Sequence, residues 1–331
     1  MSTENKLPYL PVIDSLRGLA ASMVCFYHFV CTTTGFITSA VVLKVFTYGA
    51  QGVQMFFVIS GVVIPMTMYN AGYHITKLPR FLGKRFVRIE PPYLASAVIA
   101  IAYLYLRRYV PNTVPQALPS TRDILLHLGY LVPFVDGAKW LVDVYWTLAV
   151  EFQYYLLMSL VFGLLFSKSI YLRIPIYVAF LASGYLLPSG HFVLYWLPVF
   201  LLGIAYVLYK SGTITSTEYV IVTLASSTMV GVHLGIRDLV ISLFAISAIY
   251  FFSNARNKIT GFVGDVSYSL YLLHSIIGAA FLNYMSHHAN SSAVKIALVI
   301  LTYFISLGSA WVLYRLVEKP SRQLSSKLKY D

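Results

Sequence analysis

The chain has 331 residues, of which 58% are hydrophobic and only 11% are charged, and its mean hydropathy is +0.73. A soluble globular domain carries about 25% charged residues, so this composition excludes an ordinary soluble domain and indicates a protein that crosses a membrane several times. The net charge of +12 would suggest nucleic-acid binding in a soluble protein. In a membrane protein, the positive residues are instead counted in each connection between spans to predict orientation. We therefore expect no nucleic-acid partner.

A helix needs about 20 mostly apolar residues to cross a bilayer. Ten segments fit or approach that description, and we therefore predict an all-α, polytopic membrane helix bundle that forms a single domain over residues 1–331. A further apolar stretch, DILLHLGYLVPF, lies in the long connection 108–145 and fits an interfacial or re-entrant helix. The ten predicted spans are 13–33, 50–69, 91–107, 146–166, 173–188, 192–209, 218–234, 236–253, 263–285 and 294–315.

Lysine and arginine residues in the connections predict the orientation of the bundle. If the N-terminus lies in the cytoplasm, most of the 24 Lys and Arg residues fall on the cytoplasmic side, as the positive-inside rule requires. The densest of these basic connections is KLPRFLGKRFVRIEPP. The bias predicts that both termini are cytoplasmic.

The first span contains RGLAASMVCFYH, with Arg17 and His28 inside an apolar run. Eleven residues are close to three helical turns, so the two side chains share a face and lie about 16 Å apart along the axis. Asp14, three residues before Arg17, is placed to pair with its guanidinium group. Taken singly, Arg17 fits a cytoplasmic anchor and His28 fits a helix-packing histidine. Together they indicate a polar track through the bilayer.

The basic connection after the second span carries Arg85 and Arg88, which share a face if the segment is helical. Arginine forks suit phosphate oxygens. An ordinary positive-inside loop or a patch for anionic lipids explains the same residues equally well. Before this connection, Ser60 lies in the FFVISG motif of the second span, where the Ser-Gly pair permits close helix packing or a local break in the helix.

The fourth span contains DVYWTLAVEFQYY, which begins at Trp146 and places Glu151 about 7 Å into the membrane. A carboxylate at that depth requires a partner. We predict His28, at similar depth, with the carboxylate orienting the imidazole ring. The alternative is a Glu–His or Glu–Tyr bond that only holds helices together.

The ninth span contains DVSYSLYLLHS, in which Tyr271 precedes His274 by one turn and shares its face. We interpret this pair either as support for the site or as a hydrogen bond between helices. The sequence contains no Walker loop, no G-x-S-x-G elbow and no Cys/His metal cluster, and we predict no metal site.

Six segments, in this order, resemble the acyltransferase-3 family of integral membrane O-acyltransferases over about residues 8–320. The resemblance implies a membrane domain that O-acylates carbohydrates, most often with acetyl groups. It also implies that Arg17 and His28 are essential, and that Arg85 and Arg88 correspond to the R-x-x-R motif of the family. The six segments are IDSLRGLAASMVCFYH, QGVQMFFVISG, FLGKRFVRIEPPYL, VYWTLAVEFQYYL, SYSLYLLH and VEKP.

The family's tryptophan–glutamate motif corresponds to Trp146 and Glu151, with Thr147 where serine is common. Some members of the family carry a fused SGNH-type hydrolase domain, and we expect none here. The resemblance also implies a bacterial inner membrane location, contact with membrane lipids, and no resident cofactor, because acyl-CoA serves as a co-substrate.

We therefore expect transfer of an acyl group, by default acetyl, from cytoplasmic acyl-CoA to a hydroxyl of a cell-surface or exported carbohydrate such as an exopolysaccharide or O-antigen. The acceptor is either free or lipid-linked. The sequence leaves open whether His28 is a general base or carries the acyl group. The expected roles are catalytic for His28 and Glu151, donor-binding for Arg17, Arg85 and Arg88, and supporting for Asp14, Trp146, Ser60, Tyr271 and His274.

Two other functions explain part of the pattern. A transporter or flippase for polar or lipid-linked sugars would also contain many helices and buried charged residues. A structural membrane anchor would need no ionisable residues within the bilayer.

Overall fold

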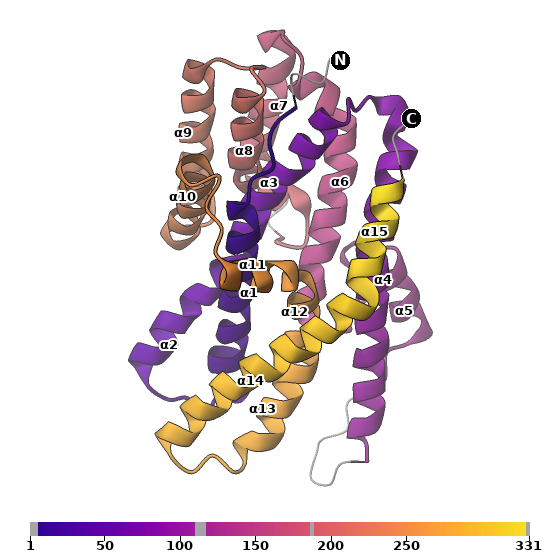
Figure 1. The fold of residues 1–331 in the computed structure, drawn as a ribbon, viewed down its shortest axis with the longest axis vertical. Coiled ribbons are helices and arrows are strands. Elements are labelled where there is room, and N and C mark those ends of the chain that lie inside the picture. Colours follow the sequence, from indigo (N-terminus) through magenta and orange to yellow (C-terminus); the bar gives the residue numbers. More distant parts are fainter. Residues whose placement is uncertain (1–5, 110–116, 186–188, 329–331) are drawn as a thin grey trace.

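The computed structural model describes residues 6–109, 117–185 and 189–328, and every regular element in these ranges is a helix. Figure 1 shows long helices side by side in the upper part of the view, with α13 and α14 extending below them. The first half of the chain forms α1 (Val12–Tyr27), α2 (Ala40–Thr47), α3 (Gly52–Asn70), α4 (Leu78–Arg107), α5 (Thr121–Leu128) and α6 (Trp146–Leu165). The second half forms α7 (Ile170–Ala182), α8 (Val193–Lys210), α9 (Ser216–His233), α10 (Ile236–Phe251), α11 (Lys258–Asp265), α12 (Ser267–Leu273), α13 (Ala279–Ser286), α14 (Ser292–Leu313) and α15 (Lys319–Lys327).

Short non-α turns join several of these helices. A π-helical turn follows α1 at His28–Thr32, another follows α12 at His274–Gly278, and a third, Tyr314–Glu318, joins α14 to α15. A 3-10 turn, Asp143–Tyr145, leads into α6. These turns matter because they carry or adjoin the polar residues singled out from the sequence.

A helix occurs at each of the ten predicted spans, but the helices differ in length. Within the described residues, five helical segments are long and apolar enough to cross a membrane, and six if the pair Lys258–Asp265 and Ser267–Ser286, bent by 55°, counts as one span. Helices α1, α7, α9 and α10 are not among them. The number of ten spans and the side on which the termini lie therefore stay predictions.

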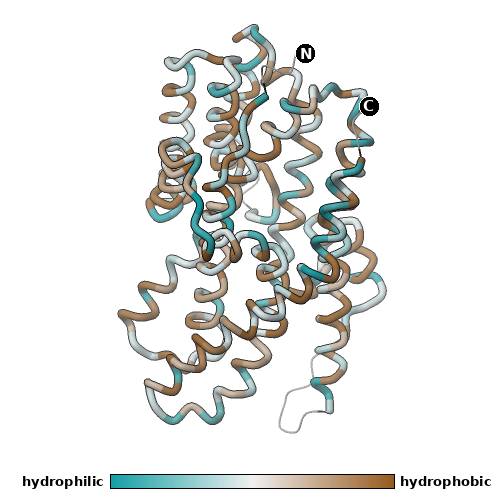
Figure 2. Tube along the Cα trace, viewed as in Figure 1, coloured by the Kyte–Doolittle hydropathy of each residue, from teal (hydrophilic) through white to brown (hydrophobic). Residues whose placement is uncertain are grey.

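The outward faces of the helices are apolar. On α14, for example, Ile300, Leu301, Phe304 and Trp311 are all exposed, and Figure 2 shows hydrophobic residues along most of the helices. Soluble monomers rarely expose such continuous apolar surface. These faces are suited to contact lipid, as expected for an integral membrane protein.

The structure corrects the predicted start of the third span. Residues 78–107 form one continuous helix, α4, so the basic segment that we predicted as a connection is helical. Pro91 and Pro92 lie inside this helix, although proline removes a backbone donor and usually ends a helix. Other helices hold the segment in place, because the Tyr268 hydroxyl donates to the Ile89 carbonyl at 2.9 Å and Ser325 donates to the Lys84 carbonyl at 2.8 Å. The basic residues of α4 therefore sit on a rigid helix.

Helices α3 and α8 cross at two glycines. A β-carbon on Gly61 would meet the Phe200 carbonyl, and one on Gly203 would meet the Val58 carbonyl. Small residues allow backbones in membrane helices to approach this closely. The crossing fixes the position of α3, which presents Ser60 to the cavity described below.

A buried ion pair joins α7 to α9. Arg173 donates to both Glu218 oxygens, at 2.8 and 2.6 Å, and the Tyr177 hydroxyl donates to the same carboxylate at 3.0 Å. The Arg173 and Glu218 side chains are only 4% and 12% exposed. The pair holds together two of the helices that are not among the candidate membrane spans.

Substituting Arg173→Ala is expected to lower the free energy of unfolding by about 3 kcal/mol, because it leaves Glu218 buried without its cation. The measurement is the thermal unfolding midpoint of the purified protein in detergent. Lys168→Ala, at an exposed cation in the preceding loop, is the matched control. Equal midpoints for the two variants would contradict the importance of the pair.

Candidate active site

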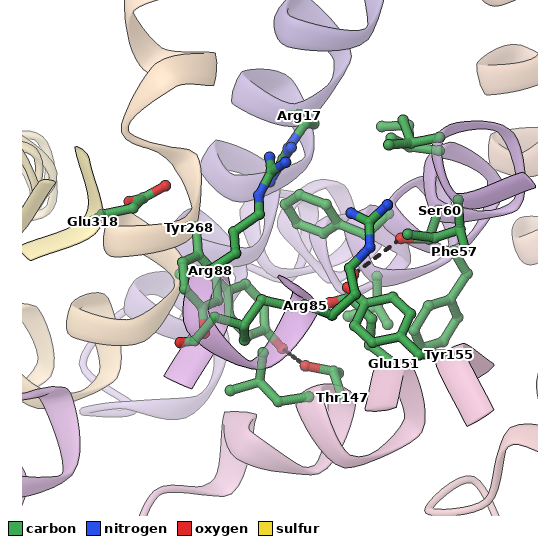
Figure 3. Close-up of a pocket in the computed structure, with 18 of the residues that line it drawn as sticks. Arg17, Phe57, Ser60, Arg85, Arg88, Thr147, Glu151, Tyr155, Tyr268 and Glu318 are labelled. Atoms are coloured by element: carbon green, nitrogen blue, oxygen red, sulfur yellow. Dashed lines mark hydrogen bonds between the residues drawn. The ribbon is translucent and has the colours of Figure 1, made fainter. Parts of the chain in front are cut away.

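A cavity of about 90 Å³ lies between α1, α3, α4, α6, α12 and the start of α15. That volume has room for several water molecules, and Figure 3 shows polar side chains from several helices pointing into it. The polar residues that line it are Arg17, Ser60, Arg85, Arg88, Thr147, Glu151, Tyr155, Tyr268, Tyr271, Glu318 and Arg322.

The cavity carries an excess of positive charge, with four arginines and two carboxylates in its lining. Arg322 is engaged, since it forms an ion pair with Glu318 at 2.5 Å. Arg88 lies close enough to Arg17, Arg85 and Arg322 for their charges to repel it. Figure 3 shows the guanidinium groups of Arg17, Arg85 and Arg88 directed into the same space.

Arg85 is the most unusual of the four arginines. It is 5% exposed, and within the described ranges its Nε and Nη2 atoms have no hydrogen-bond partner. Its guanidinium lies 5.4 Å from the ring centre of Phe81 and 5.7 Å from that of Tyr155. A buried cation without a hydrogen-bonding partner is costly. These two donors are free to bond to an anion, and the fork of Arg85 matches the geometry of a phosphate.

Glu151 is a hydrogen-bond acceptor within this cavity. Its carboxylate accepts from the Tyr155 hydroxyl, one turn later on α6, at 2.5 Å and from Ser60 on α3 at 3.4 Å. Ser60, predicted as a supporting residue, thus lies in the cavity wall beside Glu151. The carboxylate holds two hydroxyl groups at fixed positions near the arginines.

The predicted pair between His28 and Glu151 is wrong. No hydrogen bond or ion pair joins these two residues within the described part of the chain; instead the His28 Nδ1 atom lies 3.1 Å from the Thr32 hydroxyl. Helix α3 packs against both α1 and α6, which share few contacts with each other. Tyr271 of α12 contacts Thr147 at 2.8 Å, and its ring centre lies 5.7 Å from that of His274.

The predicted pair between Asp14 and Arg17 is also wrong. Asp14 accepts from the Tyr9 hydroxyl and lies 3.9 Å from Arg256, and no Asp14–Arg17 ion pair occurs among the residues that the structure describes. Asp14 faces α11, where its backbone packs against Gly264. Arg17 points instead into the cavity, where it is available to a ligand.

A row of rings connects the cavity with His28. Tyr271 lines the cavity, its ring centre is 5.7 Å from that of His274, and His274 lies 5.1 Å from His28. His274 is fully buried, and its Nδ1 atom faces the Tyr271 carbonyl at 2.8 Å. Since a carbonyl only accepts, Nδ1 of His274 carries the proton. Packed rings of Tyr271 and His274 therefore lie between the cavity and His28, and a polar track from Arg17 to His28 stays a prediction.

Trp146, the remaining predicted supporting residue, packs behind the cavity wall. Its ring stacks on Trp196 with 5.8 Å between ring centres and meets Phe57 at 6.4 Å. Phe57 itself lines the cavity. Trp146 therefore supports the wall without being among the residues that line it.

The sequence analysis missed several residues around the cavity. Arg322 and Glu318 appeared to belong to a cytoplasmic tail, although their spacing of four residues would have indicated a shared helix face. Asp143 lies in the 3-10 turn that leads into α6 and is a further charged residue that the sequence analysis did not single out. Its turn is held in place by Tyr271, whose hydroxyl donates to the Val144 carbonyl at 3.1 Å. In the described residues no group of three or more His, Cys, Asp or Glu side chains could hold a metal ion.

The fold and the cavity define a class of protein: a helical membrane protein with an arginine-lined cavity between its helices. Comparison with known proteins then identifies the family. The chain matches the acyltransferase-3 family model, described as an acyltransferase domain, over residues 10–315, and it belongs to this family. It is also similar to a protein named "Putative acetyltransferase ORF330" from Acidianus two-tailed virus, with 26% identity over 298 residues, or 81% of this chain and 83% of that one.

No solved structure matches the chain. The family match confirms the predicted resemblance, and with the apolar helices it identifies an integral membrane acyltransferase.

Proposed function

We propose that the protein transfers an acyl group, by default acetyl, from acyl-CoA to a hydroxyl group of a cell-surface or exported carbohydrate. The observation that carries the proposal is the buried guanidinium of Arg85, which lacks a hydrogen-bond partner at Nε and Nη2 among the described residues and lies in a cavity with three further arginines. The ring contacts of Tyr271 and His274 lead from this cavity to His28. Membership of the acyltransferase-3 family supplies the reaction class.

The donor is recognised by its phosphates. Arg17, Arg85 and Arg88 bind the phosphate oxygens of acyl-CoA through charge-assisted hydrogen bonds, and Arg322 adds a fourth cation at the same mouth. We infer that the thin acyl-pantetheine arm, rather than the nucleotide, enters this partly open cavity. The nucleotide stays at the entrance beside the basic residues of α4 and α15, and the positive-inside rule supports a cytoplasmic position for this end of the cavity.

His28 acts as the general base. It takes the proton of the acceptor hydroxyl while the oxygen attacks the thioester carbonyl, and collapse of the tetrahedral intermediate breaks the carbon–sulfur bond. The proton then passes from His28 to the departing thiolate, which yields the acyl ester and free CoA. Among the described residues none bonds to His28 Nε2, so this nitrogen is free to take the proton.

Glu151 acts on the donor side of the cavity. Because it accepts from Ser60 and Tyr155 and does not contact His28, its role is to fix these hydroxyls and to offset part of the arginine charge. This differs from the ring-orienting role that the sequence suggested.

Substituting Glu151→Gln is expected to lower the transfer rate about tenfold, because the neutral amide is a weaker acceptor for two hydroxyl groups. Transfer is measured with purified protein and radiolabelled acetyl-CoA, and donor affinity by calorimetry. The control is Glu90→Gln, a buried carboxylate on α4 that also accepts from a tyrosine, Tyr130, at 2.7 Å but lies outside the arginine cavity. Equal losses in the two variants would refute a specific role for Glu151.

The acceptor can be tested in cells. We propose that it is an exopolysaccharide, O-antigen or similar glycan, free or lipid-linked, modified at a bacterial inner membrane. Mass spectrometry of surface carbohydrate should show the loss of an acetyl-sized mass from an otherwise normal polymer when the gene is deleted. Loss of the polymer from the surface would instead indicate export, the transporter or flippase alternative.

A further inference from the structure

The helix that carries His28 changes its geometry at that residue. Helix α1 ends at Tyr27, and residues His28–Thr32 form a π-helical turn. Such turns are rare and frequently occur at functional sites. This one brings the Thr32 hydroxyl to 3.1 Å from His28 Nδ1 and to 3.1 Å from the His28 carbonyl oxygen.

The Thr32 hydroxyl can donate only one hydrogen bond, and this limits which nitrogen of His28 can be protonated. The Thr32 hydroxyl has one proton, which it donates to the His28 carbonyl. Both 3.1 Å contacts are hydrogen bonds at the same time only if Nδ1 donates to the hydroxyl, which is the tautomer with the ring proton on Nδ1. Nε2 is left with a free lone pair, which is the state that a general base requires.

We propose that Thr32 is a positioning residue that holds His28 in the Nδ1-protonated tautomer and leaves Nε2 free for the acceptor hydroxyl. In hydrolase triads a carboxylate has this task. Here Glu151 is bonded to Ser60 and Tyr155 instead, and the hydroxyl of the π-helical turn takes its place. The inference rests on the proposed role of His28.

Thr33 provides a matched control. Its hydroxyl also donates to the His28 carbonyl, at 2.8 Å, but has no hydrogen bond to the ring among the described contacts. Thr33→Val therefore removes a hydroxyl that stabilises the same turn. Thr32→Val removes the ring contact as well, and Thr32→Ser retains the hydroxyl.

The first readout is the tautomer itself. Protein labelled with ¹⁵N-histidine is studied by NMR, and the His28 signals are assigned by their loss in His28→Gln. In the wild type, Thr32→Ser and Thr33→Val, we expect a protonated Nδ1 and an unprotonated Nε2. In Thr32→Val we expect a mixture of the two tautomers.

The second readout is the rate of transfer. Thr32→Val should lower kcat about tenfold with the KM for acyl-CoA unchanged, whereas Thr32→Ser and Thr33→Val should remain within about twofold of the wild type. A wild-type His28 protonated on Nε2, or equal losses of kcat in Thr32→Val and Thr33→Val, would overturn the proposal. The thermal unfolding midpoints of the variants show whether a change in tautomer or in kcat comes from loss of folding instead.

The experiments also distinguish failure of the proposed acyl-transfer function from failure of the proposed role of Thr32. If His28→Ala transferred acyl groups at the wild-type rate, the base would be another residue, yet the NMR comparison would still report whether Thr32 sets the tautomer. If His28→Ala were inactive and the tautomer did not respond to Thr32→Val, the proposed function would stand and only the role of Thr32 would fall.

Discussion

His28→Ala is expected to lower acyl transfer by about 10²–10⁴-fold, the usual contribution of a general base, while acyl-CoA affinity stays within about twofold of the wild type. The separation of the two effects follows from the structure, because His28 is absent from the lining of the arginine cavity and the rings of His274 and Tyr271 lie between them. Transfer is measured with purified protein, radiolabelled acetyl-CoA and the acceptor, and donor binding by calorimetry.

The matched control for this variant is His288→Ala, at an exposed histidine after α13 that packs on Tyr284. It should transfer acyl groups at the wild-type rate. Added imidazole should restore part of the activity of His28→Ala, since the missing group is a base. Transfer by His28→Ala at close to the wild-type rate would refute the catalytic assignment.

The double variant Arg85→Gln/Arg88→Gln is expected to weaken acyl-CoA binding by at least about 100-fold. A hydrogen bond to a charged group contributes about 2 kcal/mol, which corresponds to roughly 30-fold in affinity for each arginine. Without bound acyl-CoA, the double variant should unfold at the same temperature as the wild type or higher. It loses the buried guanidinium of Arg85, which has unsatisfied donors among the described residues. Calorimetric titration and thermal unfolding measure the two effects.

Arg108→Gln is the control for this charge change. Arg108 is exposed at the opposite end of α4, so its loss should leave acyl-CoA affinity unchanged. Weaker acyl-CoA binding together with equal or higher stability in the double variant would indicate a ligand site. A cluster that only stabilises the fold would lose stability when the arginines are replaced. Unchanged affinity in the double variant would show that the donor binds elsewhere.

The positions of the helices were largely predictable, because apolar runs long enough to cross a bilayer mark them directly. The errors arose where helix-breaking residues were tolerated. Pro91 and Pro92 indicated a boundary, yet α4 continues through them, since contacts from other helices stabilise that segment. The bend of 55° between Lys258–Asp265 and Ser267–Ser286 likewise depends on packing, and no short sequence signal predicted it.

The candidate site was predictable where spacing along one helix determines the geometry. Arg85 and Arg88, three residues apart, do line the same cavity. The pairing of His28 with Glu151 failed because a sequence indicates the depth of a residue in the membrane but not the rotation of its helix. Arg322 was missed because more than 200 residues separate it from α4 in the sequence, and only the packing of α15 brings the two together.

The most direct test of the account is photolabelling with a CoA derivative that carries a diazirine at its acyl end. Peptide mapping of the purified protein should place the label on the cavity segments Thr147–Tyr155 or Tyr268–Tyr271, or on His28, and excess acetyl-CoA should prevent it. Label confined to helices outside this cavity, or label that acetyl-CoA does not displace, would contradict the assignment of the arginine cavity as the donor site.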